Sequence, residues 1–498
     1  LDVTIIEDVN TIKIDGDCAL YLEILGTNYH TSPIIGLGLY NNNVAYYIPF
    51  ANLSNLNFLK NIDIYTYDLK KLYVALKWQN FELNNIKNDL MIAASLLEYN
   101  TKDDIAYLAN QLGYDMPFYD TSYGKNGKQV PINVADIVVS KAKFIYEAKD
   151  DLLSKIKKEE VTELYNEIEV PLAYVLGDME YNGVNVDRNI LKDMGEEIKI
   201  KLELISRDIY NQAGCEFNIS SPQQLGEVLF EKLNLPHGKK TKNGYSTAVD
   251  VLNKLSNKHP IIDLVIEHRL LSKLYTTYIE GLINTIMDDE KIHTIYTQTL
   301  TRTGRLSSIE PNLQNIPIRT EYGRLIRKAF VPSADSLIIS GDYSQIELRI
   351  LAHMANVEAL IKAFNDGIDI HSKTASDIFK VDQTLVTKDM RRIAKAVNFG
   401  IIYGISSFGL AENLNISNQE AKKFIEEYLK TYPGIKEYMD KTIAKAYIDG
   451  YAKTLFNRKR VIDELKNTNY MIRQSGERMA LNTPIQGTSA DIIKKAMV

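Results

Sequence analysis

Four side chains recur at intervals of four residues within the 498-residue sequence: Arg391, Lys395, Phe399 and Tyr403. At about 100° per residue, each step of four drifts by about 40°, so a helix would carry them as one slowly winding stripe. Arginine and lysine pair with phosphate oxygens, whereas aromatic faces stack on bases. The stripe therefore predicts a helix that holds a polyphosphate at one end and a flat ring at the other.

A second segment carries an acidic side chain that we expect to face this stripe across a cleft. The short apolar run at residues 337–341 predicts a buried strand that ends at Asp342. Ser344 and Glu347 stand three residues apart before an apolar run of helical period, which predicts a capping box and a helix. Asp342 alone is also compatible with an ordinary cap or turn residue.

Together these segments resemble the motifs of a known enzyme family. Asp342-Tyr-Ser-Gln-Ile-Glu-Leu-Arg349 resembles motif A of the family-A DNA polymerases, and Arg391-x-x-x-Lys395-x-x-x-Phe399-Gly-x-x-Tyr403-Gly404 resembles their motif B. The similarity extends over essentially the whole chain and is strongest to the bacterial polymerase I branch, in the large-fragment (Klenow-like) form of Bacillus relatives. It implies an α+β multidomain fold, in which a ribonuclease-H-like 3′–5′ exonuclease-type α/β domain precedes a right-hand polymerase with thumb, palm and fingers.

The resemblance also implies a division of the chain. It assigns residues 1–160 to a vestigial exonuclease-like domain, 161–290 to the thumb with a palm edge, 291–368 to the palm with motif A, 369–467 to the fingers with motif B, and 468–498 to the start of a returning palm segment. The hydrophobic pattern of residues 1–160 is that of an α/β domain. Strand-like alternation at residues 19–24, 34–39 and 44–48 is followed by helical patterns such as that at residues 90–97.

The implied reaction is template-directed DNA synthesis in replication and repair, in which a primer 3′-hydroxyl attacks a deoxynucleoside triphosphate with the help of two Mg²⁺ ions. Asp342 and the carbonyl of Tyr343 would bind metal, and Lys395 would assist catalysis. The expected nucleotide-binding residues are Gln345, Glu347, His371, Arg391, Lys395, Phe399 and Tyr403. The expected contacts to primer-template DNA are Lys273, Arg305, Gln314, Asn315, Arg478, Asn482 and Gln486.

Several of these residues have a structural interpretation as well. Glu347 is either the capping residue described above or a bulky side chain that, with Tyr403 behind it, excludes a 2′-hydroxyl. His371 caps or packs a helix, or it lies near the nucleotide phosphates. The polar, turn-rich residues 301–317 form either a plain surface loop or a contact with primer and template, where Arg305 would reach the minor-groove edge. Phe399, in place of the tyrosine of some relatives, predicts rejection of dideoxynucleotides.

The exonuclease motifs of the family are incomplete. The expected Asp-x-Glu reads Tyr21-Leu-Glu23, and although Asp68 remains, Ile64 stands where the family has an asparagine. Two-metal hydrolysis needs several carboxylates to hold both ions. We therefore expect an inactive domain with a structural role.

Motif C of the family, a His-Asp-Glu hairpin that supplies a second metal-binding aspartate, does not occur in the sequence. The resemblance therefore predicts a chain truncated at both ends, without the 5′ nuclease domain, and with little or no polymerase activity by itself. One alternative is a module that grips primer-template DNA without catalysis. Another is a single-subunit RNA polymerase, against which Glu347 argues.

Composition indicates an ordinary globular protein of several domains, with 45% hydrophobic and 24% charged residues. The net charge of −6 does not favour a nucleic-acid partner. Basic clusters at residues 239–242, 391–395 and 458–460 do favour such a partner locally. Each cluster is also typical of a solvated surface. Cys18 and Cys215 have no metal-binding spacing. No membrane span or signal peptide is evident, and we expect a cytoplasmic, nucleoid-associated bacterial monomer.

Overall fold

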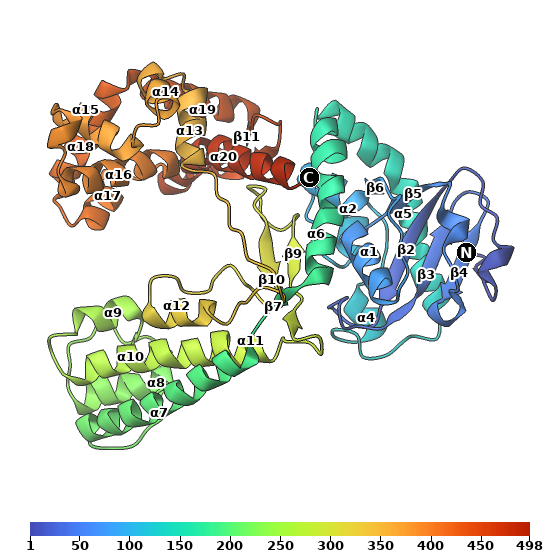
Figure 1. Cartoon of the computed structure of the whole chain (residues 1–498), viewed down its shortest axis with the longest axis horizontal. Helices are drawn as coiled ribbons and strands as arrows, with labels where there is room; N and C mark the ends of the chain where they lie inside the picture. Colours follow the sequence, from blue (N-terminus) through green and yellow to red (C-terminus); the bar gives the residue numbers. More distant parts are fainter. The chain divides into compact units, whose positions relative to one another are not determined.

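A computed structural model describes residues 1–498, which form two compact units. The first unit comprises Leu1–Tyr181, Tyr296–Ser307 and Ser340–Val498, and the second comprises Asn182–Ile295 and Ser308–Ile339. Figure 1 labels the elements of both units along the chain. The five-part division expected from the sequence is finer than this, and its boundaries stay predictions.

The first unit begins with a six-stranded sheet and its helices. The strands are β1 (Thr4–Ile5), β2 (Asp17–Ile24), β3 (Ile34–Tyr40), β4 (Ala45–Pro49), β5 (Asp63–Thr66) and β6 (Asn88–Asp89), and the helices are α1 (Leu69–Trp78), α2 (Leu90–Leu96), α3 (Ala106–Gln111), α4 (Tyr119–Tyr123), α5 (Val134–Lys158), η4 (Leu164–Glu169) and α6 (Val170–Asn182). The strand order is β1-β4-β3-β2-β5-β6, with β2 antiparallel to β3 and parallel to β5. The strands and the helix expected in this part are confirmed.

Helix α5 covers the central strands of this sheet. It contacts β2, β3 and β4, and its Val138, Ala142 and Ile145 are buried together with Tyr21 of β2. Val138, Ala142 and Ile145 recur at intervals of three to four residues, so they form one apolar face of α5. The helix therefore positions the lysines on its buried face over the middle of the sheet.

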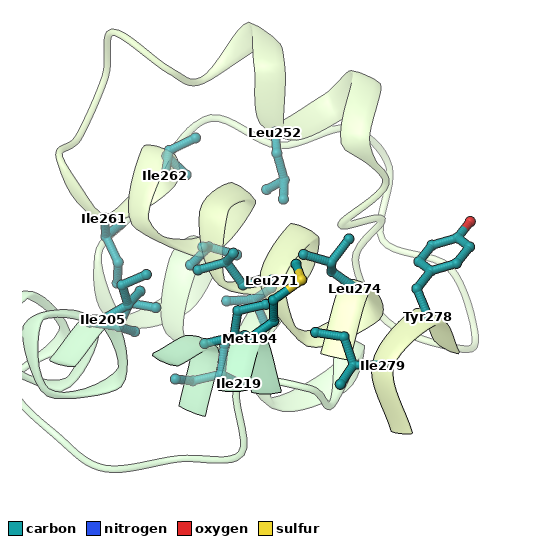
Figure 2. Close-up of a cluster of buried hydrophobic side chains, with 14 of the residues drawn as sticks. Met194, Ile205, Ile219, Leu252, Ile261, Ile262, Leu271, Leu274, Tyr278 and Ile279 are labelled. Atoms are coloured by element: carbon teal, nitrogen blue, oxygen red, sulfur yellow. The ribbon is translucent and has the colours of Figure 1, made fainter. Parts of the chain in front are cut away.

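The second unit is mainly helical. Its elements are β7 (Val184–Asn185), α7 (Arg188–Ala213), α8 (Pro222–Gly226), η5 (Glu227–Lys232), α9 (Val249–Lys254), α10 (Ile261–Lys273), η6 (Leu274–Glu280), α11 (Gly281–Ile283), β8 (Lys291–Ile292) and α12 (Glu321–Arg327). Figure 2 shows part of its core, where Met194 and Ile205 of α7 lie with Ile261 and Leu271 of α10. Ser221 caps α8 by accepting from the backbone N–H of Gln224, and Pro222 follows at the first helical position.

The C-terminal part of the first unit is almost entirely helical. It contains α13 (Ile346–Met354), α14 (Glu358–Asn365), α15 (Ile370–Phe379), α16 (Lys388–Tyr403), α17 (Ser407–Leu414), α18 (Asn418–Thr431), α19 (Pro433–Asp449), the hairpin of β11 (Tyr451–Lys453) and β12 (Lys459–Val461), and α20 (Tyr470–Met497). The helix expected to carry residues 391–403 is confirmed as α16. Although α20 is 28 residues long, no helix of the chain is apolar and long enough to cross a membrane.

Two local predictions around motif A are wrong. Residues 337–341 form no strand, and Leu337 and Ile339 are 87% and 92% exposed. A strand needs a neighbour that pairs its backbone, and none of the strands of the chain pairs with this segment. The capping box is also absent, because α13 is capped by Gln345 in a left-handed conformation with no side-chain cap hydrogen bond. Glu347 is thereby left for other contacts.

The predicted loop at residues 301–317 is only partly a loop. Residues Ser307–Ile309 form strand β10, which pairs with β9 (Ile295–Thr297) in a two-stranded sheet. The strand is only three residues long and begins with two serines, so its sequence does not differ from that of a turn-rich segment. Arg305 lies two residues before β10, so the paired strand holds the backbone on the C-terminal side of Arg305.

Candidate functional site

Helix α16 carries the four-residue stripe as predicted. Thr387 caps its N-terminus by accepting from the N–H of Met390, and Gly404 ends it with φ of +64°. The opposite face is buried through Ala394, Val397 and Ile401. Lys395 and Tyr403 are exposed and Arg391 and Phe399 are half-buried, so the packed face turns the stripe outward.

Glu347, in the first turn of α13, joins this stripe to the loop before β10. Its Oε1 accepts from Nη2 of Arg305 at 2.8 Å, and its Oε2 accepts from the hydroxyl of Tyr403 at 3.2 Å. Burial and the Glu347 carboxylate raise the pKa of Tyr403, so the phenol keeps the proton that it donates. The predicted nucleotide-binding residues Glu347 and Tyr403 are therefore in direct contact.

Arg305 also reaches α20. With its amide oxygen turned toward Arg305, Gln486 accepts from both terminal guanidinium nitrogens at 2.8 and 3.1 Å, and its amide nitrogen donates to Oδ1 of Asn482 at 3.0 Å. Asn482 in turn donates to the carbonyl of Ile402 in α16, at 3.5 Å. Three residues predicted to contact DNA thus form one hydrogen-bonded chain beside the stripe.

Arg478 lies at the end of α16. A Cβ on Gly404 would come within 3.0 Å of Cγ of Arg478, so the glycine permits both the left-handed cap and the close approach of α20. Arg478 itself is exposed. The sequence could not show this, because the two residues are more than seventy positions apart in the chain.

The side chain of His371 is buried and contacts three neighbouring side chains. The Nδ2 of Asn398 lies 3.0 Å from its Nδ1, the Nε2 of Gln345 lies 3.4 Å from its Nε2, and the ring of Phe399 lies 5.6 Å away. Burial lowers the pKa of His371 to about 4, with Arg391 acting in the same direction. The imidazole is therefore neutral near pH 7, and of its two predicted roles the packing role is the one that the structure supports.

Arg391 is held at the start of the stripe by an acidic residue that sequence reasoning assigned no role. Its Nε donates to Oδ2 of Asp369 at 3.0 Å, while Oδ1 of Asp369 caps α15 by accepting from the N–H of His371. Burial would raise the pKa of Asp369, but Arg391 and the backbone donors lower it overall. In the sequence, only the position of Asp369 directly before a predicted helix indicates a role for it, and that role is helix capping.

Asp342 and Tyr343 are exposed on the segment before α13. That Asp342 faces the stripe stays a prediction, although Gln345 and Glu347 just after it contact His371 and Tyr403. No group of three or more His, Cys, Asp or Glu side chains in the chain is arranged to hold a metal ion. Since Glu347 is already engaged by Arg305 and Tyr403, these residues by themselves do not fit a pair of Mg²⁺ ions.

The remaining predicted DNA contacts belong to the second unit. Lys273 ends α10 and is exposed, as are Gln314 and Asn315 in the segment before α12. The hydroxyl of Tyr278 donates to the carbonyl of Asn315 at 2.8 Å, which anchors that segment to the helical core. Arg305, the other predicted contact to primer and template, lies in the first unit.

In the exonuclease-like domain, lysines occupy the place of the expected carboxylate site. Nζ of Lys141 donates to Oε2 of Glu23 at 2.5 Å, and Nζ of Lys71 donates to the hydroxyl of Tyr21 at 3.1 Å. Burial lowers the pKa of Lys71. Asp68 caps α1 by accepting from the N–H of Lys71, in a left-handed conformation with φ of +67°. The sequence analysis missed both lysines, because a lysine in a helical pattern usually lies on the surface.

Comparison with protein-family models shows two matches. Residues 188–498 match DNA polymerase family A, and residues 20–148 match the ribonuclease H-like domain of DNA polymerase I. The first match covers more than half of the chain. The two matches confirm the predicted fold class, in which a ribonuclease H-like domain precedes a polymerase domain.

Curated relatives include DNA polymerase I of Geobacillus stearothermophilus and of Bacillus subtilis, each 47% identical over 100% of this chain and 58% of the relative. The chain thus spans a little over half the length of these relatives. Among solved structures, the polymerase domain of Pol1 from M. smegmatis in complex with DNA primer-template and dNTP superposes with a TM-score of 0.84 and 34% identity, over 97% of this chain and 85% of that one. The chain therefore belongs to DNA polymerase family A.

Proposed function

We propose that the chain binds primer-template DNA and a deoxynucleoside triphosphate, as part of a bacterial polymerase that extends primers in replication and repair. The observation that carries this proposal is the contact of Glu347 with both Arg305 and Tyr403. It joins a residue expected at the DNA minor groove to the aromatic end of the phosphate-binding stripe. The relatives named DNA polymerase I and the Pol1 complex with primer-template and dNTP support the proposal.

In the reaction that we propose, a primer 3′-hydroxyl loses its proton to solvent as its oxygen bonds to the α-phosphorus of the nucleotide, and the bond from that phosphorus to pyrophosphate breaks. Arg391 and Lys395 bind the β and γ phosphates, and Lys395 gives a proton to the leaving pyrophosphate. Positioning and charge neutralisation supply most of the rate in this class of reaction. Asp369 keeps the Arg391 guanidinium extended at the head of the stripe before the nucleotide arrives.

Magnesium is the cofactor implied by the family, and it would neutralise phosphate charge during the transfer. We assign Asp342 and the carbonyl of Tyr343 as its ligands in this chain. Because these residues alone do not fit two ions, every step above is assigned to side chains of the protein. The two-ion arrangement stays a proposal for the complete protein.

We also propose that the exonuclease-like domain does not hydrolyse DNA. The buried amino group of Lys71 lies against Tyr21, and Lys141 forms a buried ion pair with Glu23, where a hydrolytic site would require carboxylates free to bind metal. A buried cation opposes the binding of a second cation nearby. Incubating the chain with labelled single-stranded DNA and Mg²⁺ should give no shortening from the 3′ end.

The binding proposal is tested by fluorescence anisotropy with a labelled hairpin primer-template at fixed salt. We expect the 498-residue chain to bind the hairpin and to retain it more tightly when the matching deoxynucleotide is present. Arg391→Ala should abolish the effect of the nucleotide while leaving binding of the hairpin within about threefold. Lys192→Ala, on an exposed lysine of α7, is a control for the loss of one surface charge. Failure of the unmodified chain to bind the hairpin would refute the proposal.

A binding module without catalysis is the second candidate, and the lack of a carboxylate cluster favours it. Primer extension by the 498-residue chain, with Mg²⁺ and all four deoxynucleotides, tests the second candidate. Robust extension would exclude the module, whereas binding without extension fits both the module and a polymerase chain with little activity by itself. Ribonucleotide competition in the complete protein tests the RNA polymerase alternative, which Glu347 opposes.

A further inference from the structure

Glu98 belongs to the exonuclease-like domain but directs its side chain to the polymerase segments of the same compact unit. It lies two residues after α2, with φ of +66°. Its side chain is 22% exposed. Burial raises the pKa of Glu98, although Arg302 and a backbone donor oppose the shift. A carboxylate buried in this way is stable only if other groups compensate its charge and its lone pairs.

Those groups come from two distant segments of the sequence. Oε1 of Glu98 accepts from the backbone N–H of Val461 in β12 at 3.2 Å, and Oε2 lies 3.6 Å from Nη2 of Arg302. The same Nη2 donates to the carbonyl of Val461 at 2.5 Å. Glu98, Arg302 and Val461 therefore form a closed ring of three contacts. Val461 is the outer end of the β11–β12 hairpin, so both of its backbone polar groups are satisfied by this ring.

Arg302 and Arg305 lie on one short segment, and the residues between them are closely packed against Arg458 and α20. The hydroxyl of Thr301 donates to the carbonyl of Arg305 at 2.6 Å, and this contact closes the loop between them. A Cβ on Gly304 would lie 2.6 Å from Nε of Arg458, and one on Gly487 would lie 3.2 Å from the carbonyl of Thr303. These contacts hold the middle and the far end of the segment, and the contacts of Arg302 with Glu98 and Val461 hold its near end.

Glu98 holds the near end of this loop, and Arg305 forms its far end. Arg305 is the residue that contacts both Glu347 and Gln486. We propose that Glu98 is a positioning residue of the polymerase site: through Arg302 and Val461 it fixes the loop that presents Arg305 to primer-template DNA. The inference rests on the proposed function, and it gives a domain without nuclease motifs a part in DNA binding.

A purely structural ion pair would contribute stability without acting through Arg305. The two roles are separated by a double-mutant cycle, in which Glu98→Ala is combined with Arg305→Ala and binding of the labelled hairpin primer-template is measured. If Glu98 acts through Arg305, Glu98→Ala weakens binding about threefold to tenfold in the unmodified chain but less than about twofold in the Arg305→Ala background. Equal losses in both backgrounds, or no loss in either, would overturn the proposal.

Two further variants keep the test decisive. Glu98→Gln retains an acceptor for the N–H of Val461 but removes the charge near Arg302, so we expect an intermediate loss of binding, and it replaces Glu98→Ala in the cycle if the alanine variant does not fold. Glu147→Ala, on α5 of the same domain, removes a surface partner of Lys143 at 3.7 Å and should leave binding unchanged. If the unmodified chain does not bind the hairpin, the proposed function fails. If the chain binds but the two substitutions act additively, only the role of Glu98 fails.

Discussion

At the scale of single residues, Glu347 is held from two sides. Arg305 and Tyr403 each donate a charge-assisted hydrogen bond to the carboxylate, and the Glu347 side chain is only 12% exposed, whereas Arg305 is half-exposed. Because water screens the exposed guanidinium, this pair adds little to stability, about 1 kcal/mol or less. Its consequence is geometric, since hydrogen bonds at both carboxylate oxygens fix the orientation of the Glu347 side chain.

Lys395 is the exposed cation in the middle of the stripe, and we expect its loss to affect chemistry more than binding. In the complete protein, Lys395→Ala should slow single-turnover nucleotide incorporation about 100-fold or more, the range of a lost general acid. Binding of primer-template should change by less than about threefold. Rapid-quench kinetics and anisotropy measure the two quantities. Equal losses in rate and affinity would contradict the assigned role.

Phe399 lacks a hydroxyl at the aromatic part of the stripe, where its ring lies 5.6 Å from that of His371. A tyrosine there would bring a donor to the place where a nucleotide 3′-hydroxyl is absent. We expect Phe399→Tyr to raise the incorporation of dideoxynucleotides relative to deoxynucleotides at least about tenfold, the equivalent of one hydrogen bond. Competition between the two nucleotide types in the complete protein measures the ratio. An unchanged ratio would show that the ring does not approach the sugar.

At the scale of elements, local patterns were read correctly where the helix itself determines the outcome. The stripe of α16 depends only on residues at intervals of four along one helix. The strand expected at residues 337–341 depends on a partner strand, and sequence alone could not show that none of the strands of the chain pairs with it. The buried Lys71 and Lys141 were missed for a related reason, because their partners Tyr21 and Glu23 come from a different element.

Helix α20 contacts the loop that carries Arg305 through a residue without a side chain. A Cβ on Gly487 would lie 2.5 Å from Cγ2 of Thr454 and 3.2 Å from the carbonyl of Thr303. Gly487→Ala should therefore destabilise the first unit by about 1–3 kcal/mol, the usual cost of overpacking, despite the better helix propensity of alanine. Thermal unfolding measures the change. Gly238→Ala, where a Cβ meets nothing within 4 Å, is the control and should have little effect.

At the scale of the whole molecule, buried charges join distant parts of the first unit. Glu169, at the end of η4, accepts from Nη2 of Arg458 at 2.5 Å, from Nζ of Lys494 at 2.7 Å and from Nε2 of Gln298 at 2.7 Å. Nε of Arg458 also donates to Asp491 at 2.7 Å. The cluster therefore connects the segment after the exonuclease-like domain with the β11–β12 hairpin and α20. The N-terminal domain is part of the same compact unit as the polymerase helices.

This cluster predicts how stability depends on pH. Burial alone would raise the pKa of Glu169, but Lys494 and Arg458 outweigh it and lower the pKa to about 2. A carboxylate whose pKa is lower in the folded protein stabilises the fold fully at pH values above its pKa in the unfolded chain, which is near 4.5. This stabilisation is lost as the pH falls toward 2. The shift corresponds to about 3 kcal/mol. Asp491 acts in the opposite direction, since burial raises its pKa although Arg458 opposes the shift.

Glu169→Gln isolates the contribution of the one carboxylate. At pH 7 it should destabilise the protein by about 3–5 kcal/mol, because it leaves the buried Arg458 and Lys494 short of negative charge. Between pH 4.5 and the lowest pH at which the protein stays folded, the difference between the variant and the unmodified chain should shrink, since the carboxylate is then being protonated in the unfolded chain. Urea unfolding at several pH values measures the difference, and Glu167→Gln, on an exposed residue of η4, controls for the change of charge. A difference that stays constant with pH would show that Glu169 does not hold the two cations as an ionised group.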